Sequence, residues 1–206
     1  MITSYNEFKN FIKNLDYKPK LLLHACCAPC SSHTILLLKE YFDITIYFSN
    51  DNIYPYSEYE LRLEEIKTFC KNFEVDVIYD SYNNDDFYKA IKGYESLGER
   101  SERCYKCYSL RLEKTALKAL ELGFDYFSTT LSISPYKVEP WINEIGYALE
   151  NKYNIKYLYS NFKKEEGYKK SIALSVEYNL YRQDYCGCVF SYEERRHHDE
   201  SSGKKD

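Results

Sequence analysis

The sequence predicts a single α/β domain of three layers, with a central parallel sheet of five strands. Short runs rich in leucine, isoleucine, valine and phenylalanine alternate with longer segments whose apolar residues recur at helical spacing. The run 21–23 is continuously apolar, which is typical of a strand buried on both faces. The 206 residues suffice for one well-buried domain but are few for two. We therefore expect one domain over residues 1–194, followed by a disordered charged tail over 195–206.

The first half of the chain predicts an opening helix and three strand–helix pairs. Ser4 as N-cap and Glu7 three residues later predict a helix over 4–15. β-branched and aromatic residues predict the second and third strands over 44–48 and 75–79. Apolar residues at helical spacing predict the remaining helices over 33–40, 57–73 and 84–94. Such strand–helix–strand units make parallel strands joined by right-handed crossovers.

The second half continues the alternation. Leucine and alanine at helical spacing predict a helix that begins near Cys104 and runs to about Leu120. The remaining strands are expected over 124–130 and 155–159, and the remaining helices over 138–149 and 165–179.

Composition excludes several classes of protein. No segment approaches the roughly 18 apolar residues of a membrane span, and residues 1–10 lack the regions of a signal peptide. We therefore expect a cytoplasmic protein. The net charge of −4 argues against indiscriminate nucleic-acid binding, although a local basic face could still hold one RNA.

Seven of the eight cysteines fall into three groups, which are Cys26, Cys27 and Cys30; Cys104 and Cys107; and Cys186 and Cys188. In a reducing compartment this clustering indicates metal binding or redox catalysis and not disulfides. The eighth cysteine, Cys70, lies in a predicted amphipathic helix, and we expect it to pack in the core.

The first group follows the predicted buried strand directly, in the motif LLLHACCAPCSS at 21–32, and Pro29 suits the first turn of a helix. Ligands bind at the carboxyl ends of parallel strands, and the next helix directs its positive dipole end there. Thiols in this place should ionise easily and bind metal or do redox chemistry. The alternatives are three buried structural cysteines or, for Cys27-Ala-Pro-Cys30, a thioredoxin-like dithiol.

The other two groups are closely spaced pairs. Cys104 and Cys107 share one side of the first turn of their predicted helix. In Cys186-Gly187-Cys188 the glycine lets the backbone turn sharply enough for two thiolates to converge. The two pairs could also make a tetrahedral zinc site in a zinc-stabilised RNA-binding module.

Polar residues that follow other strands are candidates for substrate binding. Asp51 could ligate metal or orient a substrate hydroxyl, or only cap its own loop. Ser132 and Ser134 lie in a hydroxyl-rich loop that could hold phosphate or ribose oxygens, or form an ordinary capped turn. Tyr136 in the same loop is a candidate proton donor, with a structural hydroxyl as the alternative.

Four motifs occur in order along the chain: LLLHACCAPCSS at 21–32, RCYKCYSLRL at 103–112, STTLSISPYK at 128–137 and NFKKEEGYKKSIALSVEYNLYRQDYCGCVFS at 161–191. On these motifs the chain closely resembles the QueH family of epoxyqueuosine reductases over nearly all of residues 20–191. The resemblance implies an oxidoreductase that removes the epoxide oxygen of epoxyqueuosine at the wobble position of tRNA, the last step of queuosine biosynthesis. It also implies a HUP-type fold related to the ATP-pyrophosphatases. Because the SGGxDS pattern of those enzymes is missing, we expect that ATP is not a substrate.

The implied reaction predicts the cofactors. Removing an epoxide oxygen reductively needs two electrons, a Lewis acid and protons, and thiolate-bound iron can supply the first two. Four thiolates hold one [4Fe-4S] cluster, so seven clustered thiols indicate a second metal or free redox thiols. We assign the cluster to the two downstream pairs and a second, mononuclear iron to the first group.

The implied partners are tRNA and a low-potential electron donor that the sequence does not identify. A net-acidic protein must gather its basic residues locally to hold RNA. Four residues flank the loops that should converge, and we expect them to neutralise phosphates: Lys137, Lys163, Lys164 and Arg182. Solvated surface side chains are the alternative for each of them.

Overall fold

The computed structural model describes residues 1–202, and the side chains of residues 1–197. Five parallel strands form one sheet in the order β3-β2-β1-β4-β5, which confirms the predicted α/β class. The strands are β1 (Lys20–His24), β2 (Asp43–Phe48), β3 (Asp76–Tyr79), β4 (Tyr126–Thr129) and β5 (Lys156–Tyr157).

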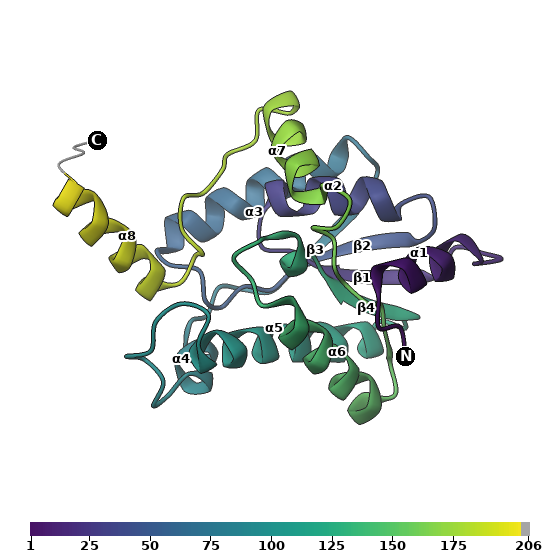
Figure 1. Cartoon of the computed structure of the whole chain (residues 1–206), viewed down its shortest axis with the longest axis horizontal. Helices are drawn as coiled ribbons and strands as arrows, with labels where there is room; N and C mark the ends of the chain where they lie inside the picture. The colour runs from purple at the N-terminus through teal and green to yellow at the C-terminus, as the bar shows by residue number, and fades with distance from the viewer. Residues whose placement is uncertain (203–206) are drawn as a thin grey trace.

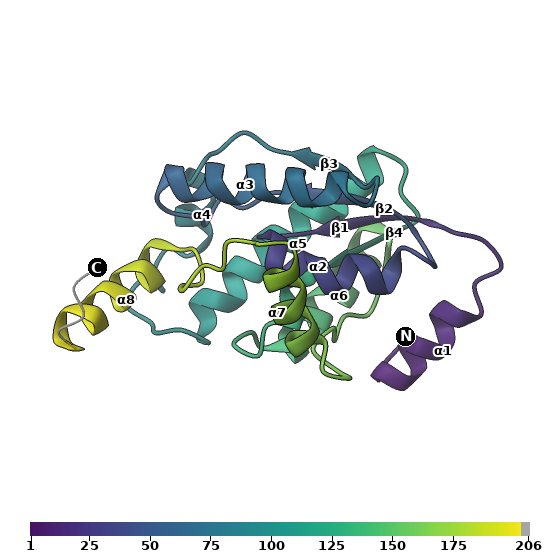
Figure 2. The ribbon, with the colours of Figure 1, turned by 90° about the horizontal axis from the view of Figure 1, so that it is seen from above.

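Helices cover both faces of this sheet (Figure 1), and Figure 2 shows α7 crossing beside α2 on one of them. That face carries α1 (Tyr5–Lys13), α2 (Ala28–Leu38), α3 (Tyr56–Lys71) and α7 (Gly167–Glu177). The opposite face carries α4 (Asp85–Ala90), α5 (Glu102–Glu121) and α6 (Glu139–Tyr153). A short 3-10 helix, η1 (Thr130–Ile133), follows β4.

The central strand β1 explains the continuous apolar run. Leu21 and Leu23 pack in the hydrophobic cluster under α1, α2 and α3, whereas Leu22 packs in the cluster under α5 and α6. Successive side chains of a strand point to opposite faces, so a strand covered on both sides needs apolar residues at every position. Cys70 is fully buried in the first of these clusters, as predicted.

Local signals set several helix boundaries. Ser4 caps α1 and accepts a hydrogen bond from the Glu7 backbone N–H at 3.3 Å. The helix after β1 begins at Ala28, five residues before the predicted start, because Pro29 in its first turn already has helical geometry. The predicted strand 124–130 ends at Thr129, where η1 begins.

The C-terminal segment forms α8 (Val189–Ser202), where the sequence predicted a disordered tail from residue 195. Aromatic packing anchors its start, since the Tyr192 ring lies 5.7 Å from that of Tyr54 and 5.4 Å from that of Tyr185. Arg195 also pairs with Asp184 at 3.1 Å. The rest of the predicted tail, 203–206, lies outside the described residues, and the domain boundary at 194 stays a prediction. Within residues 1–202, no helix combines the length and apolarity of a membrane span.

Candidate active site

The first cysteine group lies where β1 ends and α2 begins. The sulfur atoms of Cys26, Cys27 and Cys30 all lie within 4.8 Å of one another, and those of Cys26 and Cys27 are 3.8 Å apart. Among the described residues, this is the one group of three or more histidine, cysteine, aspartate or glutamate side chains whose possible metal-ligand atoms lie so close together. A tetrahedral metal ion binds thiolates at about 2.3 Å, which places their sulfurs about 3.8 Å apart. We call these cysteines the triad, and their spacing suits one metal ion.

The other four clustered cysteines come from two elements far apart in sequence. Cys104 and Cys107 lie on the first turns of α5, and Cys186 and Cys188 lie in the loop before α8. Electrostatic interactions join Cys107 to the other three thiols. Within this set, which we call the tetrad, no three sulfurs meet the 4.8 Å limit that the triad meets. Wider spacing is expected where each thiolate binds a different iron of a cluster.

Gly187 allows the sharp turn between two tetrad cysteines. Its φ of +121° is one that side-chain-bearing residues rarely adopt. A Cβ atom there would also lie 3.0 Å from the guanidinium of Arg62. The sharp turn expected at this position is present, and the close approach to Arg62 is a second reason for a glycine there.

Among the described residues, four buried cations lie near the thiols: Arg62, Arg103, Arg111 and Lys137. Lys137, 8% exposed, donates from Nζ to the Cys186 sulfur at 2.8 Å. Arg62 pairs with Glu58 at 2.6 Å and donates to the Cys186 carbonyl oxygen at 3.5 Å. Burial opposes the charge on Lys137, but the electrostatic attraction of Cys186 and the hydrogen bond to it outweigh burial and hold the pKa of Lys137 well above its usual range.

Arg111 is another of these cations and is 2% exposed. It donates to Nε2 of His24 at 3.2 Å and to Oδ1 of Asn50 at 2.7 Å, and it forms no ion pair with a carboxylate of the described residues. Burial and the charge of Arg111 lower the pKa of His24 to about 3, so His24 is neutral. A buried charge needs a counter-charge, and the charge partners left to Arg111 are the thiols, Cys107 and Cys26 foremost. The site therefore fits an anionic, thiolate-bound metal centre.

The triad thiols differ in acidity. Hydrogen bonding with Cys27 and Cys30 lowers the pKa of Cys26 well below its usual range, and Arg111 and Arg62 add to this effect. The hydrogen bond with Cys26 raises the pKa of Cys27 to about 12. One negative charge is therefore favoured on Cys26, and a bound cation would favour the thiolate form of all three.

A cavity of about 450 Å³ joins the two cysteine groups. Cys26 and Cys30 of the triad and Cys186 of the tetrad all line it, so one bound molecule can reach both groups. Gln183 also lines this cavity and donates from Nε2 to the Cys27 sulfur at 3.0 Å.

Four of the predicted substrate-site residues line the cavity: Ser134, Tyr136, Lys137 and Arg182. Tyr136 is 62% exposed and accessible to a ligand. Arg182 is also exposed and lies 5.9 Å from the ring centroid of Tyr168, another lining residue.

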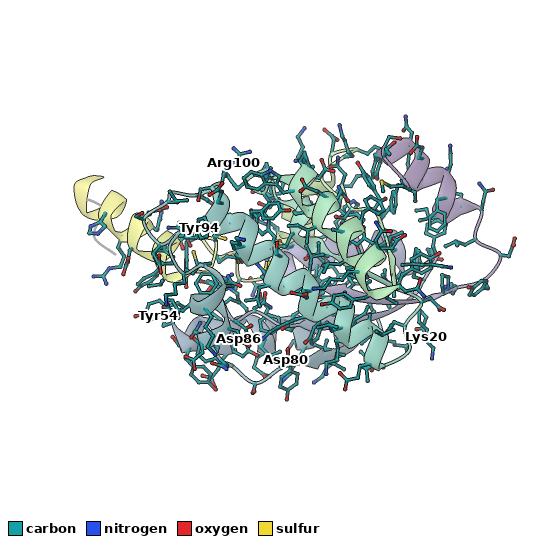
Figure 3. The ribbon with its side chains drawn as sticks, turned by 90° about the horizontal axis from the view of Figure 1, so that it is seen from below. Lys20, Tyr54, Asp80, Asp86, Tyr94 and Arg100 are labelled. Carbon is teal, nitrogen blue, oxygen red and sulfur yellow. The ribbon has the colours of Figure 1, made fainter. Side chains whose placement is uncertain are left out.

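The other predicted substrate-site residues do not line the cavity. Asp51 is buried and forms an ion pair with Lys114 at 2.6 Å. Lys114 also pairs with Asp86, near the start of α4; Asp86 is labelled in Figure 3. The Ser132 hydroxyl is buried and accepts a hydrogen bond from the backbone of Phe162. Both therefore have structural partners distant in sequence, which differ from the local caps that the alternatives predicted. Lys163 is half-buried and Lys164 exposed, in the segment before α7.

Sequence reasoning missed the buried cations Arg62 and Arg111. Arg62 lies on the apolar face of α3 beside Leu63 and Ile66, and a charge on such a face is a detectable signal. Arg111 lies four residues after Cys107, and therefore on the same face of α5 as a predicted ligand.

Comparisons with known proteins agree on one family. The family model described as epoxyqueuosine reductase QueH matches residues 21–194. The chain is 43% identical to epoxyqueuosine reductase QueH of Thermotoga maritima, over 90% of this chain and 97% of that protein. It is 42% identical to the protein of the same name from Streptococcus pyogenes serotype M1, over 84% of this chain and 71% of that protein.

Two solved structures share the fold. The U34-tRNA thiolase NcsA of Methanococcus maripaludis, solved with its [4Fe-4S] cluster, aligns with a TM-score of 0.56 at 14% identity, over 96% of this chain and 73% of that one. A predicted subunit of tRNA methyltransferase from Methanocaldococcus jannaschii aligns with a TM-score of 0.53 at 17% identity, over 90% of this chain and 89% of that one. At these identities the likeness concerns the fold alone.

Proposed function

This chain belongs to the QueH family of epoxyqueuosine reductases, and from that premise we propose how its cysteines and its cavity serve the reaction. The protein is an oxidoreductase that removes the epoxide oxygen of epoxyqueuosine at the wobble position of tRNA. The reaction consumes two electrons and two protons, releases the oxygen as water and leaves a carbon–carbon double bond. Family membership decides for this activity over the zinc-stabilised module and the thioredoxin-like dithiol.

We assign the [4Fe-4S] cluster to the tetrad, Cys104, Cys107, Cys186 and Cys188, and a second iron to the triad, Cys26, Cys27 and Cys30. The spacing of the sulfurs supports this division. The triad sulfurs lie close enough together to bind one metal ion, whereas no three tetrad sulfurs do. When bound, the iron supplies the two electrons and a Lewis acid for the oxygen.

The observation that carries the proposal is the shared cavity. Its wall includes sulfurs of both groups, so the modified base can sit against the triad and within reach of the tetrad. Arg62, Arg111 and Lys137 neutralise thiolate charge around it. We assign the delivery of a proton to the leaving oxygen to Tyr136, whose ring lines the cavity.

The tRNA then docks over the carboxyl ends of the strands. Arg182, which lines the cavity and is exposed, is placed to contact a phosphate near the modified nucleotide. Lys163 and Lys164 extend this basic surface toward α7. A low-potential electron donor completes the reaction, and a tRNA substrate places the enzyme in the cytoplasm.

Iron analysis and Mössbauer spectroscopy of anaerobically purified protein test the assignment. The wild type should contain about five irons, four in the cluster and one more. Alanine at a tetrad cysteine should bleach or convert the cluster, whereas alanine at a triad cysteine should remove about one iron and leave most of the cluster absorption. Either change should abolish epoxide reduction.

The matched control is Cys70→Ala, which should keep its iron and activity because Cys70 packs in the core away from both groups. Loss of the cluster on replacing Cys26 or Cys27, with its retention on replacing Cys104 or Cys186, would overturn the division while the reductase function stands. A colourless protein that holds zinc alone after careful anaerobic purification would overturn the redox centre itself.

A further inference from the structure

The ammonium group of Lys137 donates a hydrogen bond to the sulfur atom of Cys186. Its Nζ lies 2.8 Å from the sulfur of Cys186 and 3.5 Å from the carboxylate of Glu99. The loop after η1 holds it there, since the Lys137 backbone N–H donates to the Ser134 carbonyl oxygen at 3.2 Å. The side chain is 8% exposed, although it borders the cavity.

This placement disagrees with a role in binding tRNA phosphates, which the sequence predicted for Lys137. Phosphate contacts are made by side chains that reach the surface of the protein, as the exposed Arg182 does. Lys137 instead directs its charge at Cys186 of the tetrad, and both residues line the cavity.

A cation in this place affects the two redox states of an iron–sulfur centre unequally. Reduction adds one negative charge, and a nearby positive charge stabilises the reduced form more than the oxidised form. The potential of such clusters depends on net charge, on hydrogen bonds to the sulfurs and on exposure to solvent, and Lys137 contributes to all three.

We propose that Lys137 raises the reduction potential of the centre held by Cys186, by donating a charged hydrogen bond to that sulfur from a buried position. Lys137 thereby makes the centre easier for a low-potential donor to reduce. This inference rests on the proposed function, because it takes Cys186 to be a ligand of the iron–sulfur cluster.

A redox titration of the anaerobically purified full-length protein, followed by electron paramagnetic resonance, tests the inference. In Lys137→Gln the ratio of reduced to oxidised centre at a fixed applied potential should fall about tenfold, equivalent to a potential lowered by about 59 mV for a one-electron couple. Lys137→Arg keeps the charge and should stay close to the wild type. Lys118→Gln is the matched control, because Lys118 lies at the far end of α5 in an ion pair with Glu121.

Glu99→Gln provides a second variant should Lys137→Gln lose its iron. Glu99 is 39% exposed, so the change is tolerable, and removing its negative charge beside Lys137 should raise the potential. The two variants are thus expected to shift the potential in opposite directions. Affinity for unmodified tRNA and its salt dependence, measured in parallel, should stay the same in Lys137→Gln.

Three results would overturn the inference. An unchanged potential with weaker tRNA binding and a flatter salt dependence would make Lys137 a phosphate ligand. An unchanged potential in both variants, with unchanged tRNA binding, would leave Lys137 a purely structural role. A wild-type protein without any redox-active iron would overturn the proposed function and this inference together, whereas the first two results overturn the inference alone.

Discussion

Replacing Gly187 by alanine should damage the tetrad more than any comparable glycine change in the chain. The φ of +121° at Gly187 lies beyond the left-handed helical region and should cost a side-chain-bearing residue about 1–3 kcal/mol. The new Cβ would also lie 3.0 Å from the Arg62 guanidinium, which its 2.6 Å ion pair with Glu58 prevents from moving away. Such overpacking costs about 1–3 kcal/mol, so the total destabilisation should be about 2–6 kcal/mol.

Urea unfolding and iron analysis of the anaerobically purified variant measure this effect. Because Gly187 separates Cys186 from Cys188, we also expect iron affinity to fall about 10–100-fold, the range seen when groups supporting metal ligands are lost. The chain offers two matched controls. Gly123 has a φ of +70°, and a Cβ atom added there would meet no atom within 4 Å. Gly123→Ala should therefore lower the free energy of unfolding by the backbone strain alone, about 1–2 kcal/mol.

The second control, Gly98→Ala, should change stability by less than about 0.5 kcal/mol, because Gly98 has neither a positive φ nor a close neighbour. The reasoning fails if Gly187→Ala retains full iron and unfolds at the same urea concentration as Gly123→Ala. That result would mean that Arg62 does not restrict the loop between the two cysteines.

Three further predictions concern other parts of the molecule. Cys70→Ala should lower the free energy of unfolding by about 1–2 kcal/mol in urea unfolding and leave activity largely intact; loss of activity in a folded variant would contradict its purely packing role. Burial and Lys170 lower the pKa of His33 in the folded protein, so stability should be full above the unfolded pKa of about 6.5 and decline as the pH falls below it; His33→Gln should flatten this part of the profile, and an unchanged slope would refute the assignment. Replacing Lys163 and Lys164 together by alanine should weaken tRNA binding and flatten its salt dependence with the cluster spectrum unchanged, whereas an unaltered affinity and slope would exclude this face as the docking surface.

Much of this protein follows from local sequence patterns. The continuous apolar run 21–23 predicts the central strand because a strand covered on both faces cannot alternate with polar residues. Ser4 and Glu7 predict the start of α1, because a helix N-terminus needs a side-chain acceptor for its free N–H groups. The cysteine spacing and the four motifs predict the family, since both are written in the order of the residues.

The tertiary structure alone decides which distant residues meet. The sheet order β3-β2-β1-β4-β5 and the return of the segment after α7 bring Cys186 to a cavity that Cys26 also lines, although 159 intervening residues separate them in the chain. The same packing pairs Asp51 with Lys114 and Lys137 with Cys186, and the sequence predicted neither pairing. A sequence pattern reports the propensity of a few neighbouring residues, whereas such pairings depend on how whole helices pack on the sheet. Burial then determines how strongly such a pairing is required, because a charge excluded from water, like that of Arg111, needs a partner inside the protein.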